Sequence, residues 1–194
     1  MVILEGYPYQ GKDKRGDFKH DVQHMQNTLF LINENFLDKM KDELVKGSGT
    51  ACLRHLTPRF CDKPRAVGIT TGWSKNTGGF KELDDFVRHA INLDFERIHA
   101  LIKIHKFERV VFSCDTHDPT KIGCNIFKVD DTVLNYISNK LMRIPENVTA
   151  LITTPSLASI DRKEQMVLLY AKLSDENSTL RWKLGAKRQR VIVV

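Results

Sequence analysis

The sequence predicts an α/β fold, a three-layer α/β/α arrangement with a mixed, largely parallel sheet. Three observations favour this class. Short apolar runs suited to buried strands recur along the chain, stretches with helical spacing separate them, and 194 residues suffice for one well-filled core. We expect residues 1–154 to form the core with an N-terminal lead-in, and residues 155–194 to pack a helix and a basic tail on the same domain.

The composition is that of an ordinary globular protein, with 41% hydrophobic and 28% charged residues. No apolar run approaches the roughly 20 residues that cross a bilayer, so we expect no membrane association. Residues 1–16 lack a long apolar stretch, so we expect no secretory signal. Four cysteines are too few for a disulfide scaffold at this length. Because we also expect no secretory signal, we expect reduced thiols and a cytoplasmic location. The net charge of +6 suits an anionic ligand, a nucleic acid or an acidic protein, and equally a solvated surface.

The first predicted strand is the apolar run of residues 28–32. We expect residues 1–26 to form a surface lead-in, in which Ile3 is the only strand-like start and residues 6–16 are polar and turn-rich. We expect the strand of residues 28–32 to end at Asn33, Glu34 and Asn35, because polar groups are costly to bury without partners.

The segment after this strand leaves two alternatives open. Residues 36–46 form either one amphipathic helix or a loop with helical turns, and residues 47–51 (GSGTA) form a flexible turn. Two prolines predict a loop over residues 57–65. The second strand is expected over residues 66–71, followed by a connector over residues 72–79.

The clearest helical periodicity runs from Leu83 to Ile102, where apolar residues recur at three- and four-residue spacing. It predicts one long amphipathic helix, with a break near Asn92 as an alternative. Residues 110–113 form the next strand. This strand–helix–strand order predicts a parallel pair with a right-handed crossover.

A second helix is predicted after a loop over residues 116–130. Asp130 or Asp131 is expected to cap it, and it should stop before Pro145. A further strand is expected over residues 148–152.

The last part of the chain predicts one more helix and a basic tail. Asp161 and Glu164 have the spacing of a capping box, which predicts that the helix begins there. Residues 191–194 suit a closing strand. The tail either is a solvated end or contacts a host protein or nucleic acid, since basic residues attract phosphates without regard to sequence. Its basic residues are Arg181, Lys183, Lys187, Arg188 and Arg190.

The strongest functional feature is that the predicted strands give way to small polar residues and glycine. Ligands of open α/β sheets bind beyond the carboxyl ends of the strands, where glycines let backbone N–H groups approach phosphates. The alternative is that these residues only make turns. The candidate ligand-binding residues are Asn33, Asn35, Gly47, Gly49, Thr50, Thr70, Thr71, Ser113, Gly123 and Asn125.

Two common nucleotide motifs are missing from the sequence. Gly47–Ser48–Gly49 lacks the third glycine and the downstream acidic residue of the dinucleotide fingerprint, and the Gly-Lys-Ser/Thr of a P-loop is not found.

The order of five segments resembles the macro domain, the ADP-ribose-binding α/β/α module. The segments are LFLINEN, GSGTA, AVGITTG, RVVFS and IGCNIF followed by a helix, within about residues 27–144. The chain is also similar to uncharacterised phage and bacterial domains that carry Phe-Gly-Asp-Asn after a first strand and Gly-Ile-Pro-Thr after the second. The resemblance implies a phage or mobile-element accessory protein, in the host cytoplasm, that binds, sequesters or processes an ADP-ribose-related nucleotide.

The resemblance also implies roles for individual residues. Asn35 would face the distal ribose, and Gly49 and Thr50 would line the first phosphate loop. The second loop would contain Ser113, Gly123, Cys124, Asn125, Ile126 and Phe127, with Phe127 against a ribose or base. The chain has Gly-Ser-Gly where macro domains have three glycines, and Gly123–Cys124–Asn125 where Gly-Thr-Gly is favoured. These departures favour binding over hydrolysis.

Cysteine, histidine and acidic residues raise the further possibilities of a metal site and of catalysis. Two possible zinc half-sites meet the usual ligand spacing only in part: one is Cys52, His55 and Cys61, and the other is Cys114, His117 and Cys124. The simpler interpretation is that these cysteines are small buried residues. We therefore expect no metal and no cofactor. A nucleophile from Cys114 or Cys124 with His117, and acid–base work by Glu34, Asp115 or Asp118, are open alternatives, and Trp73 would flank the site. The rival function is an interaction protein with a degenerate pocket that binds through its basic surface.

Overall fold

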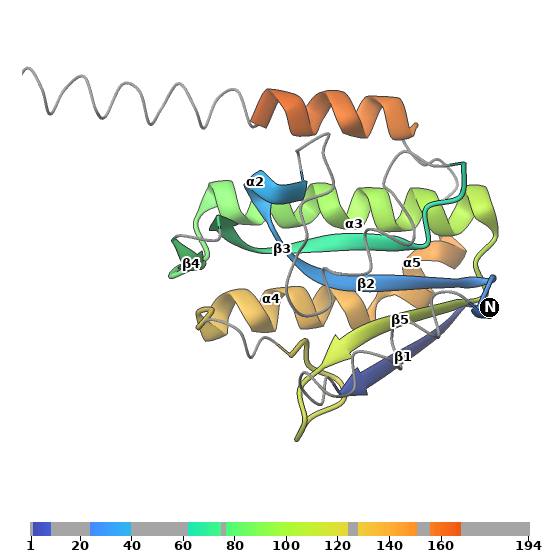
Figure 1. Ribbon diagram of the computed structural model, residues 1–194, viewed down its shortest axis with the longest axis horizontal. Coiled ribbons are helices and arrows are strands. Elements are labelled where there is room, and N and C mark those ends of the chain that lie inside the picture. The colour runs from blue at the N-terminus through green and yellow to red at the C-terminus, as the bar shows by residue number, and fades with distance from the viewer. Residues whose placement is uncertain are drawn as a thin grey trace, which may run out of the picture.

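Five strands form one sheet in the order β1–β5–β2–β3–β4 (Figure 1). They are β1 (Ile3–Pro8), β2 (Thr28–Asn35), β3 (Ala66–Ser74), β4 (Gly78–Gly79) and β5 (Arg109–Cys114). Neighbouring strands are parallel except for β4, which pairs antiparallel with β3. The α/β class with a mixed, largely parallel sheet is therefore confirmed. The computed structural model describes residues 2–8, 24–39, 62–74, 77–123, 128–150 and 156–167.

The helices are interspersed with the strands along the chain. They are α2 (Phe36–Lys39), α3 (Asp85–His105), α4 (Asp131–Met142) and α5 (Ile144–Ala150), and residues 157–167 are also helical. Apolar side chains of α3, α4 and α5 form one core cluster with the strand residues Leu29, Leu31, Val67, Ile69, Val110 and Phe112. Among the described residues, no helix is both long and apolar enough to span a membrane.

The opposite face of the sheet carries a second, smaller cluster of Phe30, Ile32, Ala66 and Val111. Adjacent residues of β2 thus enter different clusters, because side chains alternate along a strand. Burial on both faces is typical of parallel strands. Because α3, α4 and α5 all belong to the first cluster, the three-layer arrangement stays a prediction.

The N-terminal lead-in was predicted wrongly in part, because Ile3–Pro8 forms the edge strand β1. It pairs with β5 from Ile3 opposite Arg109 to Pro8 opposite Cys114. Only half-buried or exposed side chains are present in β1, so it lacks the apolar run that marks a buried strand.

The predicted end of the first strand was also wrong. β2 continues through the polar residues, with Asn33 opposite Ile69, Glu34 opposite Thr70 and Asn35 opposite Gly72. The described residues of the predicted connector over 72–79 are largely sheet as well, because β3 runs to Ser74 and β4 consists of Gly78–Gly79.

The long helix has no break, since α3 runs from Asp85 to His105. The Asp84 side chain caps it by accepting a hydrogen bond from the Val87 N–H. Asn92 instead accepts a hydrogen bond from the Tyr136 hydroxyl at 2.8 Å, which joins α3 to α4. The strands on either side of α3 are parallel but do not pair, because β2 lies between β3 and β5.

The C-terminal predictions had mixed outcomes. Asp130 caps α4, which ends at Met142 before Pro145, as predicted. The strand over residues 148–152 is wrong, since residues 148–150 belong to α5. The capping box is also wrong: the helix of residues 157–167 begins after Ser156, whose hydroxyl accepts from the Ser159 N–H at 3.2 Å.

Candidate functional site

The carboxyl ends of β2 and β5 meet at one edge of the sheet, because the two strands are parallel neighbours. The Asn33 side-chain amide donates a hydrogen bond to the Gly123 carbonyl. The Gly123 N–H in turn donates to the Ser113 carbonyl at 2.9 Å. Three predicted site residues from separate parts of the chain are thereby brought together.

Gly123 is required at this position by close packing. A Cβ on Gly123 would overlap the carbonyl group of Cys114, at the end of β5. The chain after β5 therefore lies directly against the strand, and Asn33 reaches its backbone. Residues 124–127 of the predicted second loop follow immediately and lie outside the described residues.

The ends of β2 and β3 bring a second group of predicted residues together. The Asn35 side-chain amide donates to Asp38 at 3.1 Å, and the Thr71 hydroxyl donates to the Glu34 carbonyl at 3.5 Å. The Asn35 Oδ1 lies 3.2 Å from where a Cβ on Gly72 would stand. This oxygen is buried and has no hydrogen-bond partner among the described residues. A buried acceptor without a partner is costly, so Asn35 is a candidate ligand contact.

Thr70 is separated from Asn33 by the sheet itself. It follows Ile69, which packs in the first core cluster, so its side chain points to the opposite face. That face also carries Glu34, whose carboxylate occupies the space that a Cβ on Gly68 would need. The Thr70 hydroxyl is fully buried and lacks a partner among the described residues. Thr70 and Glu34 therefore lie on the face opposite the Asn33 side chain.

An aromatic cluster borders Asn35. Trp73 stacks on Phe36 with ring centroids 5.3 Å apart and planes 9° apart, and Phe86 of α3 meets both rings edge-on. Trp73 was predicted to flank the site, and it adjoins Gly72 and packs against the residue that follows Asn35.

A groove of about 950 Å³ lies between the start of α3 and the helix of residues 157–167, and Phe86 lines it. Its other lining residues are Asp84, Asp85, His89, Ser159, Arg162, Lys163, Met166 and Val167. Because Phe86 also belongs to the aromatic cluster, the groove adjoins the end of β3.

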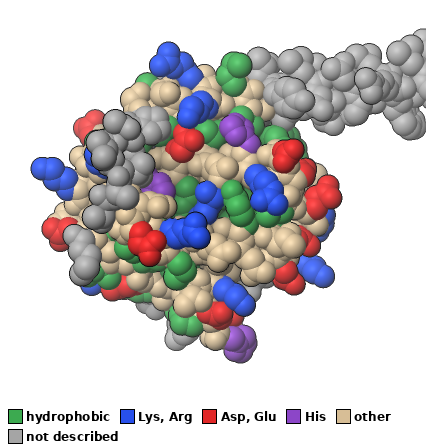
Figure 2. Space-filling model, turned by 180° about the vertical axis from the view of Figure 1, so that it is seen from behind, with side chains coloured by type: hydrophobic (Ala, Val, Ile, Leu, Met, Phe, Trp, Pro, Cys, Tyr) green, Lys and Arg blue, Asp and Glu red, His purple; other side chains and the backbone are tan. Residues whose placement is uncertain are grey.

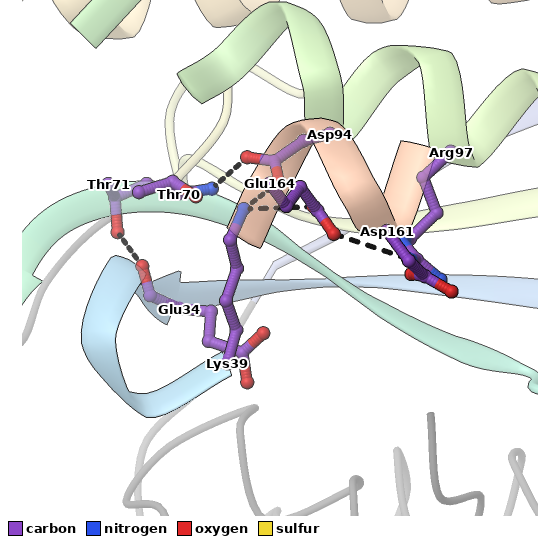
Figure 3. A network of polar contacts seen from close by, with 8 residues as sticks. All are labelled: Glu34, Lys39, Thr70, Thr71, Asp94, Arg97, Asp161 and Glu164. Atoms are coloured by element: carbon purple, nitrogen blue, oxygen red, sulfur yellow. Dashed lines mark hydrogen bonds and ion pairs between the residues drawn. The ribbon is translucent and has the colours of Figure 1, made fainter. Parts of the chain in front are cut away.

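A buried network of charged side chains lies next to this edge (Figure 3). Lys39 at the end of α2 contacts Asp94 of α3, and lies 3.6 Å from Glu164 of the helix over residues 157–167. Arg97 of α3 lies 3.2 Å from Glu164 and contacts Asp161. The side chains of Lys39, Asp94, Arg97 and Glu164 are at most 4% exposed.

The four most buried groups of this network balance in charge, because the Lys39 ammonium and the Arg97 guanidinium face the carboxylates of Asp94 and Glu164. Burial raises the pKa of Asp94, the Lys39 ammonium opposes that rise, and Glu164 adds to it. Asp94 also accepts a hydrogen bond from the Thr70 N–H at 2.7 Å. The network thus ties α2, α3 and residues 157–167 to β3.

The sequence contained a signal for this network that the prediction missed. Asp94 lies three residues after Ile91 and four before Ile98, so a carboxylate interrupts the apolar face of α3. A charged residue at a core position usually has a buried partner of opposite charge.

The residues considered for other chemistry are less suited to it. Cys114 is buried, and burial raises the pKa of its thiol, which disfavours the thiolate that a nucleophile needs. Asp115 accepts hydrogen bonds from the N–H groups of His117 and Asp118, and so shapes the turn after β5. Within the described part of the chain, no three His, Cys, Asp or Glu side chains are grouped to hold a metal ion.

Several predicted residues lie outside the described residues, and their roles stay predictions. In the two predicted loops they are Gly47, Gly49, Thr50, Cys124, Asn125, Ile126 and Phe127, and in the basic tail Arg181, Lys183, Lys187, Arg188 and Arg190. Cys52, His55 and Cys61 of the zinc alternative and the closing strand over residues 191–194 also lie outside them.

The fold and this edge define the chain as an α/β protein with polar groups gathered at the carboxyl ends of its parallel strands. No family model, no curated protein and no solved structure matches it. The resemblance to macro domains therefore rests on the order of the sequence segments alone.

Proposed function

We propose that the protein binds an ADP-ribose-related nucleotide at the carboxyl edge of β2, β3 and β5. The contact between Asn33 and Gly123 is the observation that carries the proposal. It joins the end of β2 to Gly123, a residue of the predicted second loop. The predicted first loop follows β2 and α2 in the chain and lies outside the described residues.

The chemistry of this edge suits a polyhydroxylated ligand with phosphates. Asn33, Asn35 and Thr71 are uncharged, so a ligand can exchange hydrogen bonds with such groups without leaving a buried charge unpaired. The buried Oδ1 of Asn35 would accept a hydrogen bond from a ribose hydroxyl. Backbone N–H groups around Gly49 and Asn125 would bind the diphosphate, as the resemblance implies.

Binding and sequestration are favoured over catalysis. The thiol of Cys114 is buried and neutral, so it does not supply the nucleophile that group transfer to cysteine needs. Sequestration would need only hydrogen bonds to the nucleotide, and Cys124, the other cysteine considered as a nucleophile, lies outside the described residues.

Calorimetric titration of the full chain with ADP-ribose tests the proposal. We expect saturable binding that Gly49→Asp abolishes, because a carboxylate would repel the diphosphate in the first loop. The matched control reverses charge in the tail with Arg181→Glu and Lys183→Glu, which should leave affinity unchanged. No heat of binding at millimolar ADP-ribose would overturn the proposal.

The rival proposal is an interaction protein that uses the basic tail, and it draws on the net charge of +6. On the face drawn in Figure 2, basic and acidic side chains of the described residues are interspersed. Loss of a nucleic-acid gel shift on tail reversal, with no effect of Gly49→Asp, would favour this rival. Mass spectrometry of small molecules released from the heat-denatured protein would identify a co-purifying nucleotide directly.

A further inference from the structure

Glu164 joins the two cations of the buried network. Its Oε1 lies 3.6 Å from the Lys39 Nζ, and its Oε2 lies 3.2 Å from the Arg97 Nη2. The side chain is fully buried and comes from the helix of residues 157–167, far along the chain from both partners. Figure 3 shows Lys39 reaching from α2 toward Asp94 and Glu164. A residue of the C-terminal helix therefore forms an ion pair with the last residue of α2.

Lys39 is coupled to Asn35 through the single turn of α2. Asn35 ends β2, α2 begins at Phe36, and the Asn35 amide donates to Asp38, the residue before Lys39. Phe36 is fully buried against Trp73, so this turn has little freedom to shift without moving Asn35. A change at Lys39 thus reaches Asn35 over four residues.

Lys39 is coupled to Thr70 through Asp94. One oxygen of the Asp94 carboxylate contacts Lys39, and the other accepts the Thr70 N–H at 2.7 Å. If Glu164 no longer held Lys39, the ammonium and the Asp94 carboxylate would move together. The Thr70 N–H would then lose the geometry of its hydrogen bond, and β3 would shift beside the end of β2.

We propose that Glu164 is a positioning residue for the proposed ligand edge, the carboxyl ends of β2, β3 and β5. It acts on Asn35 through Lys39, and on Thr70 through Lys39 and Asp94. The inference rests on the proposed function and extends it to the C-terminal helix. That helix lies beyond the segments that resemble macro domains, and it is a required part of the binding apparatus. Glu164 touches no ligand, and its effect on affinity passes through the position of Asn35 and through the backbone of β3 at Thr70.

Asp161 provides a matched control. It lies on the same helix as Glu164, one turn earlier, and also contacts Arg97. Within the described residues it makes no ion pair with Lys39, and its side chain is 30% exposed. Glu164→Gln and Asp161→Asn each remove one carboxylate charge from Arg97, but only the first removes one from Lys39.

The first measurement is the Kd for ADP-ribose of the full-length variants, at a temperature where thermal unfolding shows each to be folded. We expect Glu164→Gln to raise Kd about tenfold and Asp161→Asn to change it less than about twofold. Lys39→Met should raise Kd about as much as Glu164→Gln does. Lys39→Arg, which keeps the charge, should retain most of the wild-type affinity. Equal effects of Glu164→Gln and Asp161→Asn on Kd would overturn the inference.

The second measurement is hydrogen exchange of the Thr70 amide in the ligand-free protein. Glu164→Gln should speed this exchange and leave the amides of α4 unchanged, and Asp161→Asn should affect neither. If both variants speed Thr70 exchange equally, or neither does, Glu164 does not position the edge, whether or not nucleotide binds. If wild type fails to bind ADP-ribose but the exchange differs as expected, the proposed function fails and the positioning role stands.

Discussion

The ligand edge and the charged network are both polar regions inside the fold, but they are built from different groups. At the edge, the Asn33 amide donates to the Gly123 carbonyl, so these two residues meet through uncharged groups, and the Asn35 amide donates to the Asp38 carboxylate. In the network, Lys39 and Glu164 are ionisable side chains paired out of contact with water. Neutral groups can exchange partners with a ligand at modest cost, whereas buried charges must keep theirs. Under the proposed function, the edge would exchange hydrogen bonds with the ligand, and the network would fix the edge in place.

The largest expected effect comes from removing a charge from the network. Lys39→Met should lower the free energy of unfolding by about 3–5 kcal/mol, because it leaves the Asp94 and Glu164 carboxylates buried with less compensation. Denaturant unfolding measures the loss, with Lys39→Arg as the charge-keeping control. A loss below about 1 kcal/mol would mean that the network is not built on paired charges.

A steric change at the edge should have the next largest effect. Gly123→Ala would force a Cβ into the Cys114 carbonyl and should cost about 1–3 kcal/mol in the free energy of unfolding, with loss of ADP-ribose binding. Gly78→Asn is the control: among the described residues other than its chain neighbours, no atom lies within 4 Å of the Gly78 Cβ position, and asparagine is less strained than most residues at its φ of +73°. Comparable losses in both variants would show that close packing is not special to Gly123.

His99 gives a third test, away from both regions. Burial, with a smaller contribution from Lys140, lowers the pKa of His99 to about 4 from 6.5. The unfolded chain therefore binds more protons between these pH values, so the folded protein loses stability as pH falls from 6.5 toward 4. This contribution is about 2 kcal/mol once partial exposure is allowed for.

His99→Gln isolates that contribution from the carboxylates. Stability measured at pH 7 and pH 4.5 should fall less in the variant than in wild type. The raised pKa of Asp94 is common to both proteins, so it cancels in the comparison. An equal fall in both proteins would rule out His99 as the source.

The smallest expected effect is an isosteric change at the edge. Asn33→Asp replaces the amide that donates to the Gly123 carbonyl with a carboxylate oxygen that repels it. We expect a loss of about 1–2 kcal/mol in stability and weaker ADP-ribose binding. Asn139→Asp, at an exposed position of α4, is the control and should change neither quantity. Unchanged unfolding of Asn33→Asp would show that this hydrogen bond does not hold the edge together.

Much of the fold could be predicted because its signals are local. The apolar spacing from Leu83 to Ile102 identifies α3, and Asp130 marks the start of α4. β1 was missed because an edge strand needs no apolar run. The start of the last helix was misplaced because Asp161 imitates a capping residue, whereas its partner is Arg97 on α3.

The candidate site could be predicted only as a set of strand ends. Asn33, Ser113 and Gly123 were chosen for their place after buried runs, and the structure brings them together. Thr70 was in the same set, yet its side chain lies on the other face, because β3 alternates and continues past the predicted end. The network around Glu164 was missed because its partners are far apart in the chain.

The sequence by itself determined the α/β class, the main strands and helices, and the polar character of the strand ends, since these depend on composition and periodicity over short windows. Only the tertiary structure decided that β5 lies beside β2, that Asn33 reaches Gly123, and that Glu164 pairs with Lys39. Those contacts join residues that no local pattern connects. They form because packing of the sheet and the core buries these polar groups, and a buried polar group is costly unless it has a hydrogen-bond partner or an opposite charge nearby.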